Sequence, residues 1–167
     1  MPEPVARRAV IALGSNLGQR HETLDSAVAA LSELSQITVQ AVSPVHETVA
    51  VSLDGPDPER PRFANAVAVV TTTLTPEQLL AQLQRTEREH HRVRHERWGD
   101  RTLDLDLIDY EGETRASTAL TIPHPRAAER AFVLEPWADI EPEAVLAGTP
   151  IRQLLEKLRA QSPEETR

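Results

Sequence analysis

The alternation of apolar and polar positions predicts four β-strands in this chain. Two stretches, Ala9–Leu13 and Phe63–Thr73, are nearly continuous runs of apolar or β-branched residues, which are typical of buried strands. Two others, Ile37–Val45 and Leu103–Tyr110, alternate with a period of two, as half-buried strands do. Pro44 indicates that its strand ends there or lies at a sheet edge, because proline cannot donate a ladder hydrogen bond.

Apolar residues repeat at helical spacing in other stretches. Spacings of three and four residues from Leu24 to Leu34 predict an amphipathic helix. A second helix is predicted after Thr75, which supplies a cap and is followed by a proline and an acid in the first turn. Two further helices are predicted at Ala127–Leu134 and Ile151–Leu158.

Three segments between these elements are predicted to be turns or loops. We interpret Gly14–Gly18, which follows a strand and precedes a helix, as a turn. Thr48–Arg62 is rich in proline and charge, and Arg92–Arg101 is a charged loop. A loop as long as Thr48–Arg62 inside a compact domain is usually functional or disordered, so it is a candidate part of a site.

The order strand, helix, strand, strand, helix, strand predicts the fold. We expect an α+β protein, a ferredoxin-like βαββαβ three-layer sandwich with an antiparallel sheet, helices packed on it and extra C-terminal elements. The helices are expected on one face of the sheet, which would leave the other face free for a ligand. The length of 167 residues predicts a single domain, 1–167, with a folded core at 8–160 and frayed tails at 1–7 and 161–167.

Composition excludes several classes of function. The chain has no cysteine, which excludes a disulfide framework, a thiolate zinc site and a cysteine nucleophile. Acids outnumber bases 26 to 18, and the net charge of −8 argues against non-specific binding to nucleic acid or anionic membranes. No apolar run approaches the ~18 residues of a membrane span and no signal peptide is evident, so we expect a cytoplasmic protein. The lone lysine, Lys157, follows no glycine-rich loop, which excludes a P-loop nucleotidase.

Two carboxylates stand out on the predicted strand Leu103–Tyr110. Asp104 and Asp106 face away from the leucines between them and lie roughly 7 Å apart along the strand. Such carboxylates can converge on a pair of hard cations, and Mg²⁺ suits these ligands better than zinc. An edge strand with solvated acids on its outer face is the alternative interpretation.

A cluster of arginines precedes these carboxylates. Six arginines (85, 88, 92, 94, 97 and 101) against four acids leave residues 85–101 at +2, while the rest of the chain carries −10. A guanidinium group can donate two parallel hydrogen bonds to phosphate oxygens, so the cluster indicates binding of a specific polyanion. Arg85 and Arg88 are explained by ion pairs within a helix, whereas the arginines from Arg92 onward are expected beyond the helix, beside the carboxylates. These residues alone predict magnesium-dependent phosphoryl transfer.

Several motifs carry a resemblance to a known family. They are Gly14-Ser15-Asn16-Leu17-Gly18, Phe63-x-Asn65-Ala66, Arg92-x-Arg94, Glu96-Arg97-Trp98-Gly99-x-Arg101-Thr102-Leu103-Asp104-Leu105-Asp106 and Ile122-Pro123-His124. From about Val10 to Val145 the chain resembles the 6-hydroxymethyl-7,8-dihydropterin pyrophosphokinases of folate biosynthesis. The resemblance implies transfer of pyrophosphate from ATP to the hydroxymethyl oxygen of the pterin, with two Mg²⁺ ions, giving the pterin diphosphate and AMP.

The resemblance also implies roles for individual residues. Catalysis is assigned to Arg92, Arg101, Asp104 and Asp106, with Asp104 and Asp106 as ligands of both metal ions. The pterin is assigned to Thr48, Val49, Val51, Phe63, Asn65, Trp98 and Phe132, with the two phenylalanines sandwiching its ring and Asn16 shaping the same pocket. ATP is assigned to Gln84, Glu87, Arg92, Arg94, Trp98, Arg101, Leu107, Thr121, His124 and Arg130.

The sequence departs from the family pattern at four positions. His95 replaces a lysine, Asp100 a proline, Phe63 a tyrosine and Pro125 an aromatic residue. These differences concern rate and nucleotide affinity more than the class of reaction. The expected partners are the substrates ATP and the pterin, with no nucleic acid or membrane, and a monomer is expected. A ligand-sensing module without chemistry and a two-metal nuclease are the alternative hypotheses.

Overall fold

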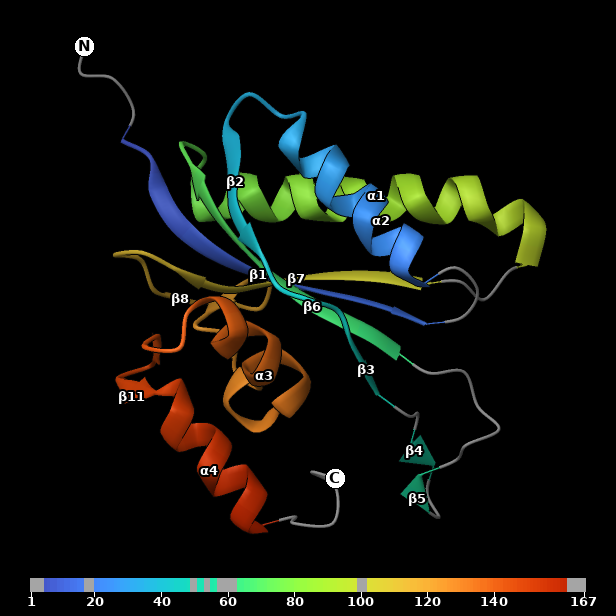
Figure 1. Ribbon diagram of the computed structural model, residues 1–167. Helices are drawn as coiled ribbons and strands as arrows, with labels where there is room; N and C mark the ends of the chain where they lie inside the picture. The colour runs from blue at the N-terminus through green and yellow to red at the C-terminus, as the bar shows by residue number, and fades with distance from the viewer. Residues whose placement is uncertain are drawn as a thin grey trace.

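The computed structural model has an antiparallel sheet at its centre, with helices on both faces (Figure 1). The structure describes residues 5–16, 20–48, 51–52, 55–56, 63–98 and 102–161, and of residues 16, 20, 48, 51–52, 55–56, 91–98 and 102 the backbone alone. The strands lie in the order β2-β6-β1-β7, with β3 also paired to β6. Their bounds are β1 (Arg7–Asn16), β2 (Ile37–Val42), β3 (His46–Thr48), β6 (Phe63–Thr72) and β7 (Thr102–Tyr110).

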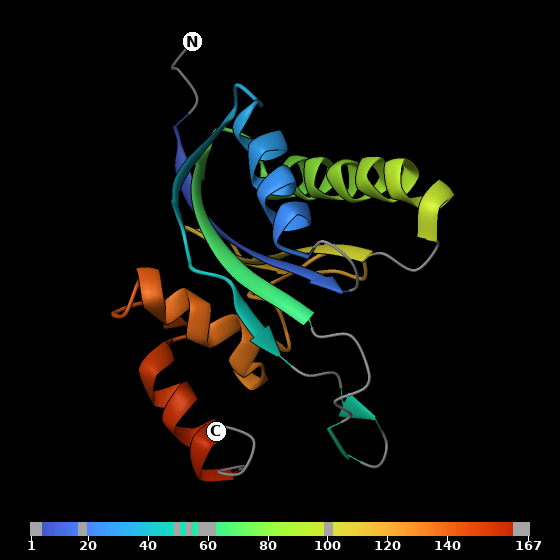
Figure 2. The ribbon, with the colours of Figure 1, turned by 45° about the vertical axis from the view of Figure 1, so that its right-hand side comes forward.

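The helices lie in two layers (Figures 1 and 2). α1 (Arg20–Ser32) and α2 (Pro76–Trp98) cover one face of the sheet. α3 (Ala131–Ile140) covers part of the other face, and α4 (Ile151–Gln161) packs against α3. The order β1-α1-β2-β6-α2-β7 and the antiparallel sheet confirm the predicted ferredoxin-like sandwich, with α3 and α4 as the extra C-terminal elements.

The expectation that helices cover only one face is wrong, and the alternation along the strands explains why. Successive residues of a strand point to opposite faces. One face of the sheet buries a first core with α1 and α2, which includes Ile11, Leu13, Leu24, Leu31, Leu79, Leu83, Leu103 and Leu105. The other face also carries apolar residues, and these form a second core that includes Val10, Val67, Val69, Ile108, Val133, Leu134, Trp137 and Ile151. The α3 and α4 helices therefore cover the apolar part of this second face, and only its polar residues are left for a ligand.

Two predicted loops are wrong because regular structure extends through them. Gly14–Asn16, predicted as part of a turn, continues β1, because these residues pair with β6 on one side and β7 on the other. Arg92–Trp98, predicted as a charged loop, continues α2. Charged residues are good helix formers, and Gly99 is the first helix breaker in that sequence.

Other boundaries shift by smaller amounts. The predicted strand Ile37–Val45 ends at Val42, before Pro44. The predicted helix Ala127–Leu134 begins as a short 3-10 turn, η1 (Ala127–Glu129), and α3 starts after it, because Arg130 has an extended backbone (φ −114°, ψ 99°). Three small hairpins were not predicted: β4 (Val51–Ser52) with β5 (Gly55–Pro56), β8 (Arg115–Ala116) with β9 (Thr121–Ile122), and β10 (Val145–Leu146) with β11 (Thr149–Pro150).

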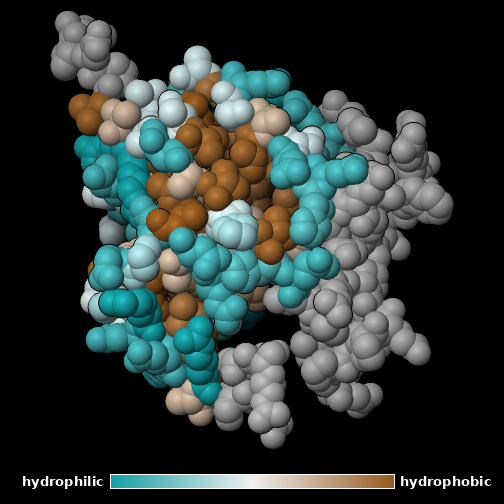
Figure 3. Space-filling view, viewed as in Figure 1, coloured by the Kyte–Doolittle hydropathy of each residue, from teal (hydrophilic) through white to brown (hydrophobic). Residues whose placement is uncertain are grey.

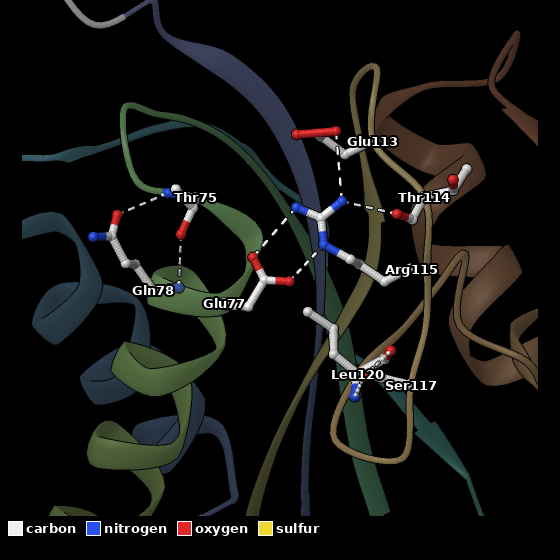
Figure 4. Close-up of polar contacts among 8 residues, drawn as sticks. All are labelled: Thr75, Glu77, Gln78, Glu113, Thr114, Arg115, Ser117 and Leu120. Carbon is white, nitrogen blue, oxygen red and sulfur yellow. Dashed lines mark hydrogen bonds and ion pairs between the residues drawn. The ribbon is translucent and has the colours of Figure 1, made fainter.

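The hairpin β8–β9 is tied to the first turn of α2 (Figure 4). The Arg115 guanidinium donates to both carboxylate oxygens of Glu77, at 2.5 and 3.3 Å, and it also lies 3.5 Å from Glu113. The hydrogen bond from Arg115 lowers the pKa of Glu77. The predicted cap at Thr75 is confirmed, because its hydroxyl accepts from the Gln78 N–H at 3.1 Å while the Gln78 side chain accepts from the Thr75 N–H at 2.9 Å.

The two edges of the sheet differ in character. β2 pairs only with β6 in the described part of the chain, and its last residue, Val42, is 41% exposed. Figure 3 shows apolar side chains gathered over α1 and β2. β7 forms the opposite edge and carries the two aspartates predicted to bind metal. Within the described ranges, none of the helices is long and apolar enough to cross a membrane.

Candidate active site

The predicted polar residues lie on neighbouring strands, on one face of the sheet. β1 runs between β6 and β7, and Gly14 lies opposite Asn65 on one side and Asp104 on the other. Ala12, two residues along β1, lies opposite Asp106. Because strands are about 4.8 Å apart, the Asn65 and Asp104 backbones lie roughly 10 Å apart, with a glycine between them. Asn65 is buried, Asp106 half-buried and Asp104 exposed.

Gly14 leaves room for the Asn65 amide. A Cβ placed on residue 14 would lie 3.3 Å from Asn65 Oδ1, close enough that the amide would have to move by a few tenths of an ångström. The glycine motif that the sequence presented as a turn therefore lets the Asn65 side chain lie against the backbone of β1. Gly14 therefore allows the Asn65 side chain to approach the β1 backbone closely.

Glu87 holds the strand that carries the aspartates. Its Oε2 accepts a hydrogen bond of 2.8 Å from the backbone N–H of Leu105, the residue between Asp104 and Asp106. Glu87 projects from α2, which lies along the β7 edge of the sheet. The predicted nucleotide contact Gln84 lies one turn earlier on the same helix and is exposed.

A cavity of about 200 Å³ lies beside β7. Leu80 of α2, residues 105–107 of β7, residues 118–121 at the tip of β8–β9, and His124 and Pro125 line it. Four predicted site residues meet there: Asp106, Leu107, Thr121 and His124. Apolar walls with a few convergent polar groups are typical of small-molecule sites. The Arg115–Glu77 contact fixes the hairpin that forms one of its walls.

His124 presents a defined tautomer to this cavity. Its Nδ1 accepts from the backbone N–H of Arg126 at 3.2 Å, so the neutral ring carries its proton on Nε2. Burial lowers the pKa of His124, the Asp106 carboxylate partly opposes this shift, and the Arg130 and Arg126 charges add to it. The net pKa is below the ordinary value of 6.5, so the ring is a neutral hydrogen-bond donor at neutral pH.

The lowered pKa of His124 predicts a component of acid sensitivity. Below pH 6.5 the unfolded chain binds a proton at His124 that the folded protein does not yet bind, so stability is present above that pH and is lost as the pH falls below it. His124→Asn keeps an acceptor near the Nδ1 position without a titrating ring. We expect urea unfolding between pH 7.5 and 5 to show a smaller loss of stability in His124→Asn than in the parent chain. Equal losses would contradict the assignment.

Two exposed aromatic rings lie on β6, the strand that carries Asn65, and on α3, which packs against β6. Phe63, at the start of β6, is 36% exposed, and Phe132, in the first turn of α3, is 40% exposed. The Arg130 guanidinium lies 5.5 Å from the centre of the Phe132 ring, a cation–π distance. Large exposed aromatic rings beside buried polar groups are typical of a surface that stacks on a flat ligand.

Several predicted site residues lie partly or wholly outside the described part of the chain. Val49 and Arg101 are outside the described residues. For Asn16, Thr48, Val51, Arg92, Arg94 and Trp98 the backbone alone is described. That backbone places Arg92, Arg94 and Trp98 on the last turns of α2, which corrects their prediction as residues of a loop beyond the helix.

Sequence reasoning missed other residues of this region. Leu80 and Thr118 line the cavity but were not predicted as site residues. Pro125, noted in the sequence as a departure from the family pattern, lines it as well. His46 pairs in register with Asn65. It was not singled out, because the sequence around it does not indicate which residues it contacts in the fold. A β3–β6 pairing was needed to place it.

Comparison with known proteins identifies the family. A family model described as 7,8-dihydro-6-hydroxymethylpterin-pyrophosphokinase (HPPK) matches residues 10–142. The chain belongs to the HPPK family. The 2-amino-4-hydroxy-6-hydroxymethyldihydropteridine pyrophosphokinase of Bacillus subtilis is 41% identical over 145 residues, which cover 84% of each chain. That of Haemophilus influenzae is 42% identical over 143 residues, which cover 86% of this chain and 87% of the relative. The resemblance predicted from the motifs is confirmed, and this HPPK is a pyrophosphokinase enzyme.

Solved structures show the same fold. Wild-type Plasmodium falciparum HPPK-DHPS with pteroate matches with a TM-score of 0.74 at 15% identity, over 99% of this chain and 46% of that chain. A structure of HPPK-DHPS in complex with substrates matches with a TM-score of 0.73 at 13% identity, over 96% of this chain and 45% of that one. This HPPK chain therefore spans less than half the length of these solved chains, with which it shares its fold.

The donor set at β7 fits Mg²⁺. Within the described ranges, no group of three or more histidine, aspartate or glutamate side chains could hold a metal ion. Asp104 and Asp106 supply two carboxylates on one face of a strand. Mg²⁺ is commonly held by one or two carboxylates together with waters and substrate phosphates, so two carboxylates suffice where a polyphosphate binds.

Proposed function

We propose that this chain transfers pyrophosphate from ATP to the hydroxymethyl oxygen of 6-hydroxymethyl-7,8-dihydropterin, in folate biosynthesis. The observation that carries this proposal is the row Asn65, Gly14, Asp104 across three strands. It places a buried amide suited to a heterocycle beside carboxylates suited to the cations of a polyphosphate. Family membership and the names of the relatives support the same reaction.

The nucleotide is proposed to bind on the β7 side of this row. The cavity lined by Leu107, Thr121 and His124 opens beside Asp106, and we propose it for the nucleoside of ATP. We assign the remaining ATP contacts to Gln84, Glu87, Arg92, Arg94, Trp98, Arg101 and Arg130. Asp104 and Asp106 would hold two Mg²⁺ ions, which when bound neutralise charge on the triphosphate oxygens.

The pterin is proposed to bind on the β6 side. Phe63 and Phe132 would stack on the two faces of its ring, and the Asn65 amide would pair with the polar edge of the heterocycle. Thr48, Val49, Val51 and Trp98 complete the proposed contacts, and Asn16 shapes the pocket. Gly14 leaves room for the Asn65 Oδ1 beside the backbone of β1.

The reaction forms one P–O bond, breaks another and releases the proton of the pterin hydroxyl group to solvent. The pterin hydroxymethyl oxygen attacks the β-phosphorus of ATP, the bond from that phosphorus to the bridging α,β-oxygen breaks, and AMP leaves. Phosphoryl transfer requires mainly positioning and charge stabilisation from the protein. Arg92 and Arg101 are proposed to stabilise the charge that develops on the transferred group. His124, neutral at pH 7, can donate from Nε2 to the nucleotide without adding charge.

We also propose that the protein acts as a cytoplasmic monomer that binds neither nucleic acid nor membrane. The net charge of −8 supports this part of the proposal, since a protein that binds the phosphate backbone non-specifically carries a basic surface.

The test is to incubate the purified chain with ATP, Mg²⁺ and the hydroxymethyldihydropterin and to follow the products by phosphorus NMR. We expect AMP to appear only when the pterin is present, together with an equal amount of pterin diphosphate. Formation of ADP would show an ordinary kinase. Binding of both ligands without consumption of ATP would favour a ligand-sensing module, and salt-sensitive binding of nucleic acid with cleavage would favour a nuclease.

A further inference from the structure

We propose that His46 is a positioning residue, which sets the distance between the two rings of the pterin site through a contact with α3. This inference rests on the proposed function, because it assigns a role in binding the dihydropterin. His46 lies on β3, directly opposite Asn65 in the pairing of β3 with β6. It is therefore next to the residue proposed to pair with the pterin edge.

His46 joins β3 to two acids of α3. Its Nε2 donates to Asp139 Oδ2 at 2.5 Å, and its Nδ1 lies 3.9 Å from Glu135 Oε2. The His46 side chain is 30% exposed, and those of the two acids are 35% and 39% exposed. The ring is thus enclosed enough to be held in one position, and its partners both come from the same helix.

The same face of α3 carries Phe132. Phe132, Glu135 and Asp139 are spaced by three and four residues, so they lie one above the other along the helix. On the strand side, Thr48 of β3 pairs with Phe63 of β6. The two rings proposed to sandwich the pterin therefore belong to β6 and α3. The contact of His46 joins α3 to β3, which is paired with β6, and it lies about 10 Å along the helix from Phe132.

Polar contacts tie both faces of β3 to the neighbouring helices. Successive residues point to opposite faces, and Glu47, beside His46, lies 3.4 Å from His21 of α1. The strand has three residues, and neither His46 nor Glu47 is buried. Backbone pairing with β6 places β3, and Val45 before it packs against the first core. The histidine–carboxylate pairs on its two faces add contacts to α1 and α3.

α3 itself does not depend on His46 for its attachment. Val133, Leu134 and Trp137 are buried in the second core, against β6. Loss of the His46 contact is therefore expected to leave α3 packed on the second core. The side of the helix that carries Phe132 would then shift slightly relative to β3. A displacement of about 1 Å in a site that stacks on a flat ring is enough to weaken binding and orientation.

The test compares His46→Leu, which cannot hydrogen-bond, with His46→Gln, whose Nε2 can occupy the position of the histidine Nε2. We expect His46→Leu to raise the KM for the hydroxymethyldihydropterin about five- to tenfold, with the KM for ATP changed less than about twofold, because one charge-assisted hydrogen bond at a partly exposed site is lost. His46→Gln is expected to restore most of the affinity. Arg152→Ala is the matched control, since Arg152 lies on α4, away from β3, and its ion pair with Glu143, at 3.3 Å, is exposed.

The outcomes separate the positioning role from a structural one and from the proposed function. Equal rises in both KM values, in parallel with a lower melting temperature, would show that His46 only stabilises the fold and would overturn the positioning role. An unchanged pterin KM in His46→Leu would overturn it as well, with the reaction of the parent chain intact. If the parent chain binds no dihydropterin, the proposed function fails and the positioning role fails with it.

Discussion

Replacing Asp106 by alanine is expected to abolish turnover while the protein stays folded. Asp106 lies beside the cavity proposed for ATP, on the sheet face opposite to the core residues Leu105 and Leu107. Its loss removes one of the two carboxylates proposed to hold Mg²⁺, and loss of one group that stabilises developing charge costs about 10²–10³-fold or more in kcat. Formation of AMP measures the activity, and circular dichroism reports the fold.

Asp109→Ala is the matched control for Asp106→Ala. Asp109 lies on the same strand and is also half-buried, but it is near Arg8 and Glu141 and outside the proposed site. Burial raises the pKa of Asp109, so the folded state disfavours its charged form, and removal of the carboxylate is expected to leave the fold intact. We expect Asp109→Ala to retain activity. An Asp106→Ala protein that unfolds would show that the aspartate pair is structural.

Replacing Asn65 by alanine is expected to weaken binding of the dihydropterin about 10- to 100-fold while binding of ATP stays nearly unchanged. Asn65 is buried at the pterin side, and a ligand polar edge left without its partner costs about 1–3 kcal/mol. ATP is proposed to bind on the other side of Gly14, so it does not contact the amide. Calorimetric titration with each ligand separately measures both affinities.

Thr72→Val provides the control for Asn65→Ala. Thr72 is a buried polar residue on the same strand, at the opposite end from Asn65, and its hydroxyl accepts from the Leu74 N–H at 3.1 Å. Its replacement tests whether loss of any buried hydrogen bond of β6 weakens ligand binding. Equal losses of pterin and ATP affinity in Asn65→Ala would show that the assignment of the pocket is wrong.

The predicted fold was correct where one short-range pattern decided each element. Alternation along Leu103–Tyr110 predicted that Asp104 and Asp106 point away from the leucine core, and the structure confirms it. Helix α2 was predicted from its cap at Thr75 and the proline and acid that follow, but its predicted end was wrong, because the charged residues from Arg92 onward continue the helix to Trp98. The high charge of this segment was interpreted as a sign of a loop, although charged residues are compatible with a helix.

The second helical layer could not be derived from local patterns. The sequence predicted helices near Ala127–Leu134 and Ile151–Leu158, but which face they cover depends on which strand residues need burial after the sheet has formed. Val10, Val67 and Ile108 come from three strands and meet only when β1 lies between β6 and β7. Their burial by α3 and α4 leaves only the polar end of that face open.

Taken by itself, the sequence determined the family, the ferredoxin-like order of elements and the candidate residues Asn65, Asp104 and Asp106, because motifs and period-two alternation are local properties. Only the tertiary structure decided that Gly14 separates the amide from the carboxylates, that Glu87 binds the backbone of β7, and that His46 connects β3 to α3. Each of these contacts joins residues far apart in the chain. Strand register and helix packing determine them, and neither can be read from spacing along the sequence.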